Sequence, residues 1–173
     1  STGLLHEALH VNELGGKTAP GQIWIKRVVA EMGGKDAIIV DSETNIDEAV
    51  AGTVAAAFGF QGQKCSACSR AIVDAKVYDE FVAKLKIEVD KIVIGDPKDN
   101  VRMGPVVSPR AEKTILEYIE IGKKEGKLIC GGSKVKGLDG YYIQPTVIVN
   151  VKPTARIMQE EIFGPVLAVC TEK

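Results

Sequence analysis

Short apolar runs alternate with helical patterns along most of this chain, and this alternation constrains the fold more than any other feature. Residues 36–41 form an apolar run typical of a buried strand, and a possible helix cap follows at Asn45 or Thr44. Apolar residues at every fourth position then predict an amphipathic helix over about 76–91. Strands that alternate with helices favour a parallel sheet. We therefore predict an α/β domain with a largely parallel sheet and flanking helices.

The same patterns predict the remaining elements. Residues 1–22 show no clear apolar period and contain two glycine-rich breaks, so an irregular N-terminal segment is expected there, followed by a domain over 23–173. Pro109 is well placed at a helix start. The other predicted elements are a helix that ends near residue 58, a helix over 109–124, a helical turn at 155–161, a strand-rich stretch at 141–151, and strands at 70–73, 128–130 and 165–170.

The composition argues against several classes of function. The 173 residues are 45% hydrophobic and 26% charged, which is ordinary for a soluble domain with a core. A formal net charge of −1 gives no electrostatic reason to expect binding to nucleic acid or to an anionic membrane. We expect no membrane span and no secretory signal, because no apolar run suits either. The four cysteines form no dense framework, which favours a reducing, cytoplasmic setting.

The loop at residues 61–66 carries a cysteine among residues that are poor core material. Cys65 lies between glutamine, glycine and lysine residues, and Gly62 lets the backbone approach a ligand closely. A cysteine attacks as the thiolate, and it therefore needs a base or a positive field near neutral pH. Glu31, beside a Gly-Gly pair in an earlier loop, is a candidate for that base. Cys65 and Glu31 are the candidate nucleophile and general base.

Other interpretations of these residues stay open. A lone cysteine is usually a small buried hydrophobe, and a glutamate beside two glycines is usually a surface charge. Cys65 and Cys68 also form a C-x-x-C pair, which could be a redox couple or half of a zinc site. The only histidines, His6 and His10, are far upstream, and there is no second C-x-x-C, so we predict no metal.

A third motif occupies residues 160–166. Adjacent carboxylates in sequence rarely share a face, so this motif could be a loop with two exposed acids. Phe163 is followed by Gly164-Pro165, which indicates instead a rigid turn that presents one acid and one aromatic surface.

These three motifs together resemble the signature series of the aldehyde dehydrogenase superfamily. They read Glu-Met-Gly-Gly-Lys at 31–35, Gly-Gln-Lys-Cys-Ser-Ala at 62–67 and Glu-Glu-Ile-Phe-Gly-Pro-Val at 160–166, and the resemblance covers about residues 20–173. Within the superfamily, the chain looks closest to the branch that oxidises L-glutamate 5-semialdehyde (1-pyrroline-5-carboxylate) to glutamate in proline breakdown. The resemblance implies the fold of the family's catalytic domain and an oxidoreductase that uses NAD or NADP.

The resemblance also implies a role for each candidate residue. Cys65 would attack the aldehyde to give a thiohemiacetal, which becomes a thioester after hydride transfer. Glu31 would activate the water that hydrolyses the thioester, and the backbone N–H of Cys65 would be one donor of an oxyanion hole. Glu161 would hold the ribose hydroxyls on the nicotinamide side of the cofactor, and Phe163 would pack near it. Ser66 would hydrogen-bond the substrate carboxylate.

Members of this family run to several hundred residues, so the resemblance implies that parts of the fold lie outside this sequence. They include the Rossmann-like domain that binds most of the NAD, the asparagine of the oxyanion hole, the C-terminal substrate loop and the oligomerisation strands. We therefore expect a partial catalytic domain over 23–173 that is inactive alone, from a homo-oligomeric parent that acts on a small aldehyde. The alternatives are a non-catalytic binding or assembly module that keeps the fold and, as a weaker rival, a C-x-x-C redox protein.

Overall fold

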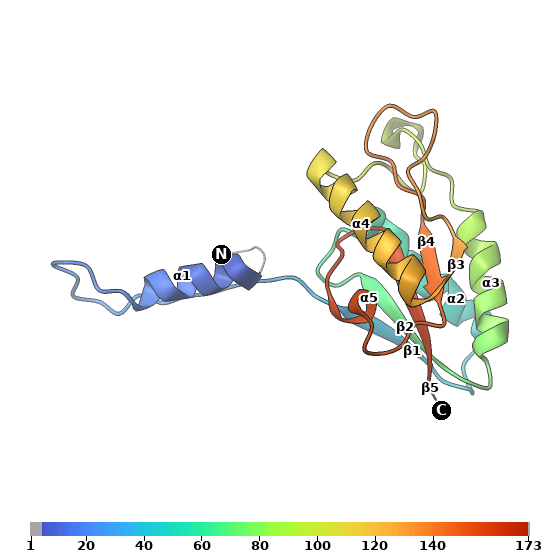
Figure 1. The fold of residues 1–173 in the computed structure, drawn as a ribbon, viewed down its shortest axis with the longest axis horizontal. Helices are drawn as coiled ribbons and strands as arrows, with labels where there is room; N and C mark the ends of the chain where they lie inside the picture. Colours follow the sequence, from blue (N-terminus) through green and yellow to red (C-terminus); the bar gives the residue numbers. More distant parts are fainter. Residues whose placement is uncertain (1–4, 173) are drawn as a thin grey trace. The chain divides into compact units, whose positions relative to one another are not determined.

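The computed structural model describes residues 5–172, and the chain divides into two compact units (Figure 1). The smaller unit ends at Gly34, and the larger unit begins at Lys35. This boundary lies later than the predicted one between residues 22 and 23, because residues 23–34 cluster with the helix that precedes them. Among residues 5–172, no helix is both long and apolar enough to cross a membrane.

The smaller unit contains helix α1 (Leu5–Gly16), where the sequence predicted irregular chain. That prediction is wrong for this stretch, and residues 1–4 of it lie outside the described part. Gly15 and Gly16 end the helix instead of interrupting it, and an ion pair of 2.7 Å between Glu13 and Lys17 supports the last turn. The Val28 side chain lies so close to Gly15 that a Cβ there would overlap it. Glycine therefore lets the following chain pack against the end of α1.

The larger unit is built on a five-stranded sheet in the order β1-β2-β5-β4-β3 (Figure 1). The prediction of a largely parallel sheet is confirmed, since only the pairing of β3 with β4 is antiparallel. The predicted strand over residues 36–41 is confirmed as β1, but as an edge strand it is buried only in part: Val40 is 1% exposed and Ile39 is 76% exposed. The strands are β1 (Asp36–Val40), β2 (Cys68–Asp74), β3 (Lys127–Cys130), β4 (Thr146–Val149) and β5 (Val166–Glu172).

Helices cover both faces of this sheet, as predicted (Figure 1). Alternate residues of a strand point to opposite faces, so Val147 and Val149 pack with α2 and α3, while Ile148 packs with α4 and α5. The helices are α2 (Ile46–Phe58), α3 (Tyr78–Asp90), α4 (Pro109–Glu125) and α5 (Arg156–Gln159), with short 3-10 helices η1 (Gly59–Gly62) and η2 (Pro97–Asp99).

Local sequence explains where helices α2 and α4 start. The Asn45 side chain accepts hydrogen bonds from the backbone of Asp47 at 3.1 Å and of Glu48 at 3.4 Å, which caps α2 as predicted. Ser108 accepts from the Ala111 N–H at 3.1 Å and caps α4, with proline at the first helical position. These caps fix the starts of α2, which leads into the Cys65 loop, and of α4.

Candidate functional site

The candidate residues of the larger unit lie in loops that precede parallel strands. Cys65 and Ser66 precede β2, and Glu161 and Phe163 precede β5. Strands β2 and β5 are parallel neighbours, so the loops before them meet at the same edge of the sheet. The fold thereby brings together two motifs that are far apart in sequence.

The loop before β2 has an unusual backbone. Phe60, Gln61 and Gly62 all have positive φ angles, of 54°, 59° and 67°. Non-glycine residues adopt this left-handed region at a free-energy cost, so the first two store strain. A Cβ on Gly62 would overlap the carbonyl oxygen of Gly164, which follows Phe163 directly. The left-handed stretch therefore seats the loop against the backbone of the turn before β5.

Cys65 lies in a turn closed by a hydrogen bond from the Ala67 N–H to the Lys64 carbonyl at 3.1 Å. Its thiol is exposed, and so is the side chain of Ser66 beside it. Both side chains are therefore accessible from solvent.

Cys68 has different surroundings. It is buried at the start of β2, and burial raises the pKa of its thiol to about 11. All four cysteines are free thiols. Of the C-x-x-C pair, only Cys65 is accessible to a small electrophile.

The turn before β5 separates its two acids. The Glu160 carboxylate accepts hydrogen bonds from Arg156 at 2.9 and 2.8 Å and from the Tyr118 hydroxyl at 2.7 Å. These donors, Arg156 first, lower the pKa of Glu160 to about 2. Glu160 is committed to joining α4 and α5, while the half-buried Glu161 is the acid that accompanies Phe163. This arrangement agrees with the interpretation that the turn presents one acid and one aromatic ring.

A cavity of about 510 Å³ lies among the loop before β2, the segment over residues 97–107 and Phe163, and neither Cys65 nor Glu161 is among its lining residues. Phe60, Gln61 and Gln63 line it from the Cys65 side, and Phe163 lines it from the turn before β5. Phe163 has a left-handed φ angle of 57°. Its ring is 44% exposed, so the turn presents an aromatic surface to solvent. A mostly apolar cavity with a few polar groups is typical of a ligand-binding site.

Lys35 and Arg70 form a cationic pair at this edge that the sequence did not indicate. The Arg70 guanidinium donates to the Lys35 carbonyl and, at 3.4 Å, to the Met158 carbonyl, so it joins the chain before β1 to α5. The Lys35 ammonium is buried without a hydrogen-bond partner. Burial and the charge of Arg70 lower the pKa of Lys35 to about 8, against the opposing charges of Glu161 and Glu160. The only sequence feature that could have drawn attention to Lys35 is its position directly after the Gly-Gly pair.

Glu31 lies in the smaller unit, where its side chain is exposed. Cys65 lies in the larger unit, so no distance between these two side chains is defined. Their partnership as base and nucleophile stays a prediction.

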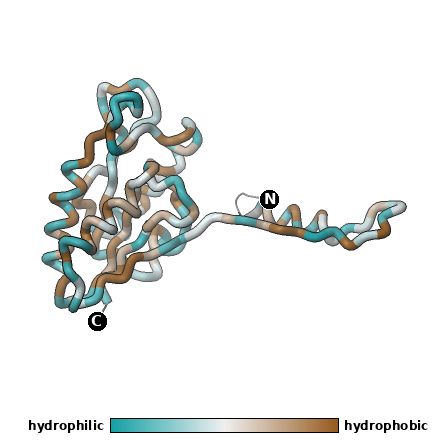
Figure 2. Tube along the Cα trace, turned by 180° about the vertical axis from the view of Figure 1, so that it is seen from behind, coloured by the Kyte–Doolittle hydropathy of each residue, from teal (hydrophilic) through white to brown (hydrophobic). Residues whose placement is uncertain are grey.

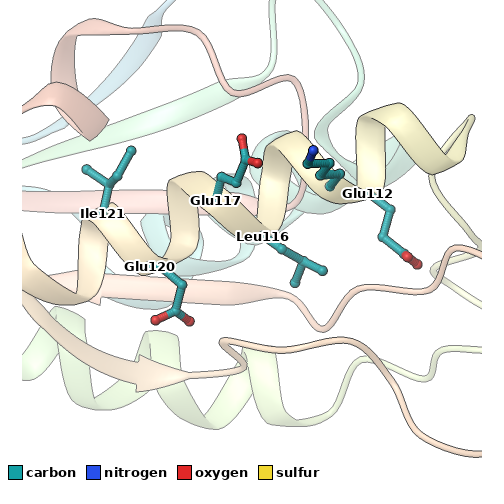
Figure 3. Close-up of a pocket in the computed structure, with 6 residues that line it drawn as sticks. Glu112, Leu116, Glu117, Glu120 and Ile121 are labelled. Atoms are coloured by element: carbon teal, nitrogen blue, oxygen red, sulfur yellow. The ribbon is translucent and has the colours of Figure 1, made fainter.

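A second hollow runs along the outer surface of α4, but its side chains do not converge. Figure 3 shows Glu117 and Ile121 on one side of the helix and Leu116 and Glu120 on the other. Within residues 5–172, no group of three or more His, Cys, Asp or Glu side chains is placed to hold a metal ion. The hollow therefore offers no cluster of groups for chemistry.

Comparison with known proteins gives a consistent result. The model of the aldehyde dehydrogenase family matches residues 10–173, which extends the resemblance beyond its predicted start near residue 20. A 1-pyrroline-5-carboxylate dehydrogenase from Geobacillus sp. (strain WCH70) is 52% identical over 175 residues, which cover 99% of this chain and 33% of that protein. The protein of the same name from Bacillus subtilis (strain 168) is 48% identical over 172 residues, covering 98% of this chain and 33% of its own length.

A solved structure shares the fold. The crystal structure of 1-pyrroline-5-carboxylate dehydrogenase from Thermus with bound NAD superposes with a TM-score of 0.96 and 49% sequence identity. The superposition covers 99% of this chain and 33% of that one. The chain thus spans about a third of the length of the relatives that it matches.

Proposed function

The chain belongs to the aldehyde dehydrogenase family, and from this membership we propose that it carries the catalytic cysteine and the cofactor-binding turn of an enzyme that oxidises L-glutamate 5-semialdehyde to glutamate with NAD or NADP. The observation that carries the proposal is the seating of the Cys65 loop against Gly164, beside Glu161 and Phe163. Identity of about half with relatives named 1-pyrroline-5-carboxylate dehydrogenase supports the substrate. Because the chain spans a third of those relatives, we propose the activity for the complete protein.

Cys65 begins the proposed reaction. Its thiolate attacks the aldehyde carbon, and the new C–S bond leaves an oxyanion that the backbone N–H of Cys65 stabilises. Loss of hydride from the same carbon converts the thiohemiacetal to a thioester on Cys65. Glu31 then removes a proton from water, which attacks the thioester carbonyl, releases the carboxylic acid and restores the thiol. Ser66 holds the substrate carboxylate during these steps.

The cofactor, when bound, supplies the acceptor for that hydride. Glu161 would hold the ribose hydroxyls of the cofactor, and the exposed ring of Phe163 would pack near its nicotinamide. The bound NAD named for the Thermus structure supports a nicotinamide cofactor for the complete protein.

We test the acyl chemistry with an activated ester, because this reaction needs no cofactor. In mono-4-nitrophenyl glutarate, the free carboxylate and the acyl length match those of the substrate. The Cys65 thiolate should displace nitrophenolate, and water should then hydrolyse the thioester to glutarate. We expect a burst of nitrophenolate stoichiometric with the chain and a glutaryl group on the Cys65 peptide.

Two variants separate the roles. Cys65→Ser should abolish the burst, while Glu31→Gln should keep it and prolong the lifetime of the acyl group. A burst that persists in Cys65→Ser would exclude Cys65 as the nucleophile. An unchanged acyl lifetime in Glu31→Gln would exclude Glu31 as the base.

The proposal also concerns the dehydrogenase activity of this chain by itself. We expect this 173-residue chain to produce no steady NADH from glutamate semialdehyde and NAD, since its relatives are about three times longer. Steady NADH formation by the purified chain would refute this. Free thiols are typical of a reducing compartment, which keeps the cytoplasm as the expected setting, and a homo-oligomeric parent remains part of the proposal.

A further inference from the structure

Two glutamine side chains tie the Cys65 loop to a distant segment of the chain. The Gln63 side-chain oxygen accepts a hydrogen bond from the Val107 N–H at 2.9 Å. With its amide oriented to satisfy both neighbours, Gln61 accepts from the Gly104 N–H at 2.6 Å and donates to the Phe60 carbonyl at 3.1 Å. Two backbone N–H groups within residues 104–107 thus donate hydrogen bonds, one to each glutamine side chain.

The segment over residues 104–107 is held in place by its own burial and backbone hydrogen bonds. Met103 and Val106 are fully or almost fully buried. The Met103 N–H donates to the Val93 carbonyl at 3.2 Å, and the Val106 N–H donates to the Tyr141 carbonyl at 2.9 Å. The glutamines therefore attach the Cys65 loop to a segment that is itself packed into the fold.

The backbone of the loop needs such support. Phe60 and Gln61 have left-handed φ angles, which are strained for non-glycine residues. Strain of this kind persists only where surrounding contacts overdetermine the conformation. Gly62 contacts Gly164 on one side, and the two glutamines reach residues 104–107 on the other. Loss of the glutamine hydrogen bonds would leave fewer contacts to offset the strain at Phe60 and Gln61.

We propose that Gln63, assisted by Gln61, is a positioning residue that holds the Cys65 turn in register with the Glu161–Phe163 turn by clamping it to residues 104–107. This inference rests on the proposed role of Cys65 as nucleophile. Gln63 does not need to touch the substrate, since it acts on the thiol through the backbone of the loop.

The test compares two replacements of Gln63 in the full chain. Gln63→Met keeps the shape of the side chain and removes its hydrogen bonds. Gln63→Glu keeps an acceptor for the Val107 N–H. Gln22→Met is the matched control, because Gln22 also accepts from a backbone N–H, that of Ala19 at 3.3 Å, but within the smaller unit.

Two readouts are needed for each variant. Hydrogen exchange at the Val107 amide reports the clamp itself, and the rate of iodoacetamide alkylation of Cys65 across a pH series reports its consequence for the thiol. Slow alkylation of the buried Cys130 and Cys170 in the same samples shows that the variant is folded.

We expect Gln63→Met to speed exchange at Val107 and to change the Cys65 alkylation rate by about three- to tenfold, the effect of losing roughly one net hydrogen bond, with an altered pH profile. Gln63→Glu should restore protection at Val107, and Gln22→Met should change neither readout. Unchanged Cys65 reactivity and an unchanged pH profile in Gln63→Met would overturn the proposal, whether or not Val107 exchange increases. Failure of the proposed function is distinguishable, because it shows in the native chain as the absence of a glutaryl group on Cys65.

Discussion

Cys65 and Cys68 show how strongly position decides the chemistry of one residue type. Only two residues separate them, yet one thiol is exposed in a turn and the other is buried at the start of β2. Burial keeps the Cys68 thiol protonated by raising its pKa to about 11, and Cys130 is affected in the same way. A protonated, inaccessible thiol is inert toward electrophiles. Of the four cysteines, Cys65 is therefore the one candidate nucleophile, and the three buried cysteines serve as internal controls in alkylation experiments.

Lys35 gives a pH-dependent prediction at the same scale. Its pKa falls from 10.5 to about 8 in the folded state. Between these values the unfolded chain binds more protons, so this residue makes stability rise with pH from about 8 to 10.5. Below that window the buried ammonium is destabilising, by up to about 3 kcal/mol if the whole shift is realised. Lys35→Met should therefore stabilise the fold near neutral pH, and its advantage should shrink as the lysine deprotonates.

Urea unfolding of Lys35→Met and of the native chain, at roughly pH 7 and roughly pH 10, measures this difference. The exposed Lys152 supplies the control variant, Lys152→Met, which should show no such pH dependence relative to the native chain. A stability difference for Lys35→Met that is equal at both pH values would contradict the assignment of a lowered pKa to Lys35.

Two glycines within helices test the packing of the elements. Gly52 in α2 has open space where a Cβ would lie. A Cβ on Gly122 in α4 would overlap the Ile148 side chain of β4 and crowd Ile157 of α5. Glycine is disfavoured within a helix, so Gly52→Ala should stabilise the protein by about 0.5–1 kcal/mol. Gly122→Ala should instead destabilise it by about 1–3 kcal/mol, because overpacking outweighs the gain in helix propensity.

Thermal and urea unfolding of both variants check this pair, and each variant serves as the control for the other. Stabilisation by Gly122→Ala would mean that α4 does not lie as close to the sheet as the structure has it.

Local patterns were sufficient to predict the elements that are stabilised locally. Asn45 and Pro109 mark the starts of α2 and α4, and the sheet was predicted as largely parallel from the alternation alone. Helix α1 was missed because Gly15 and Gly16 look the same in sequence whether they break a helix or end it. The exposure of β1 was missed because an apolar run does not distinguish a central strand from an edge strand.

The site could be predicted only in part, for a related reason. Cys65, Ser66, Glu161 and Phe163 lie within motifs, so sequence patterns identified them, and the fold places their loops at one edge. The parts that hold these motifs in place come from remote segments. The bond from Val107 to Gln63 and the burial of Lys35 depend on tertiary contacts that leave no local periodicity. The pairing of Glu31 with Cys65 stays a prediction.

At the scale of the whole chain, the smaller unit differs from the larger one in its surface. Its residues 23–25 are apolar and strongly exposed: Ile23 is 80%, Trp24 77% and Ile25 93% exposed. Figure 2 colours stretches of the smaller unit as hydrophobic. Contiguous exposed apolar side chains promote association. We therefore predict that this chain associates through residues 23–25.

Trp24 is the single tryptophan and reports on this surface directly. At low protein concentration its fluorescence should resemble that of an indole in water and be quenched efficiently by acrylamide. As concentration rises, self-association should shift the emission to shorter wavelength, in step with the mass measured by sedimentation. Blue-shifted, poorly quenched emission at the lowest concentration of a monomeric sample would show that residues 23–25 are covered within the chain.

The most direct test of the account is the alkylation rate of each cysteine, resolved by peptide mass mapping in the native and the urea-unfolded chain. Cys65 should react much faster than Cys68, Cys130 and Cys170 in the native chain, and faster than it does itself after unfolding. That result would show that this chain already assembles the environment of a catalytic thiol. If native Cys65 reacts no faster than in the unfolded chain, this part of the fold does not activate the thiol, and the proposed nucleophile site would be contradicted for this chain.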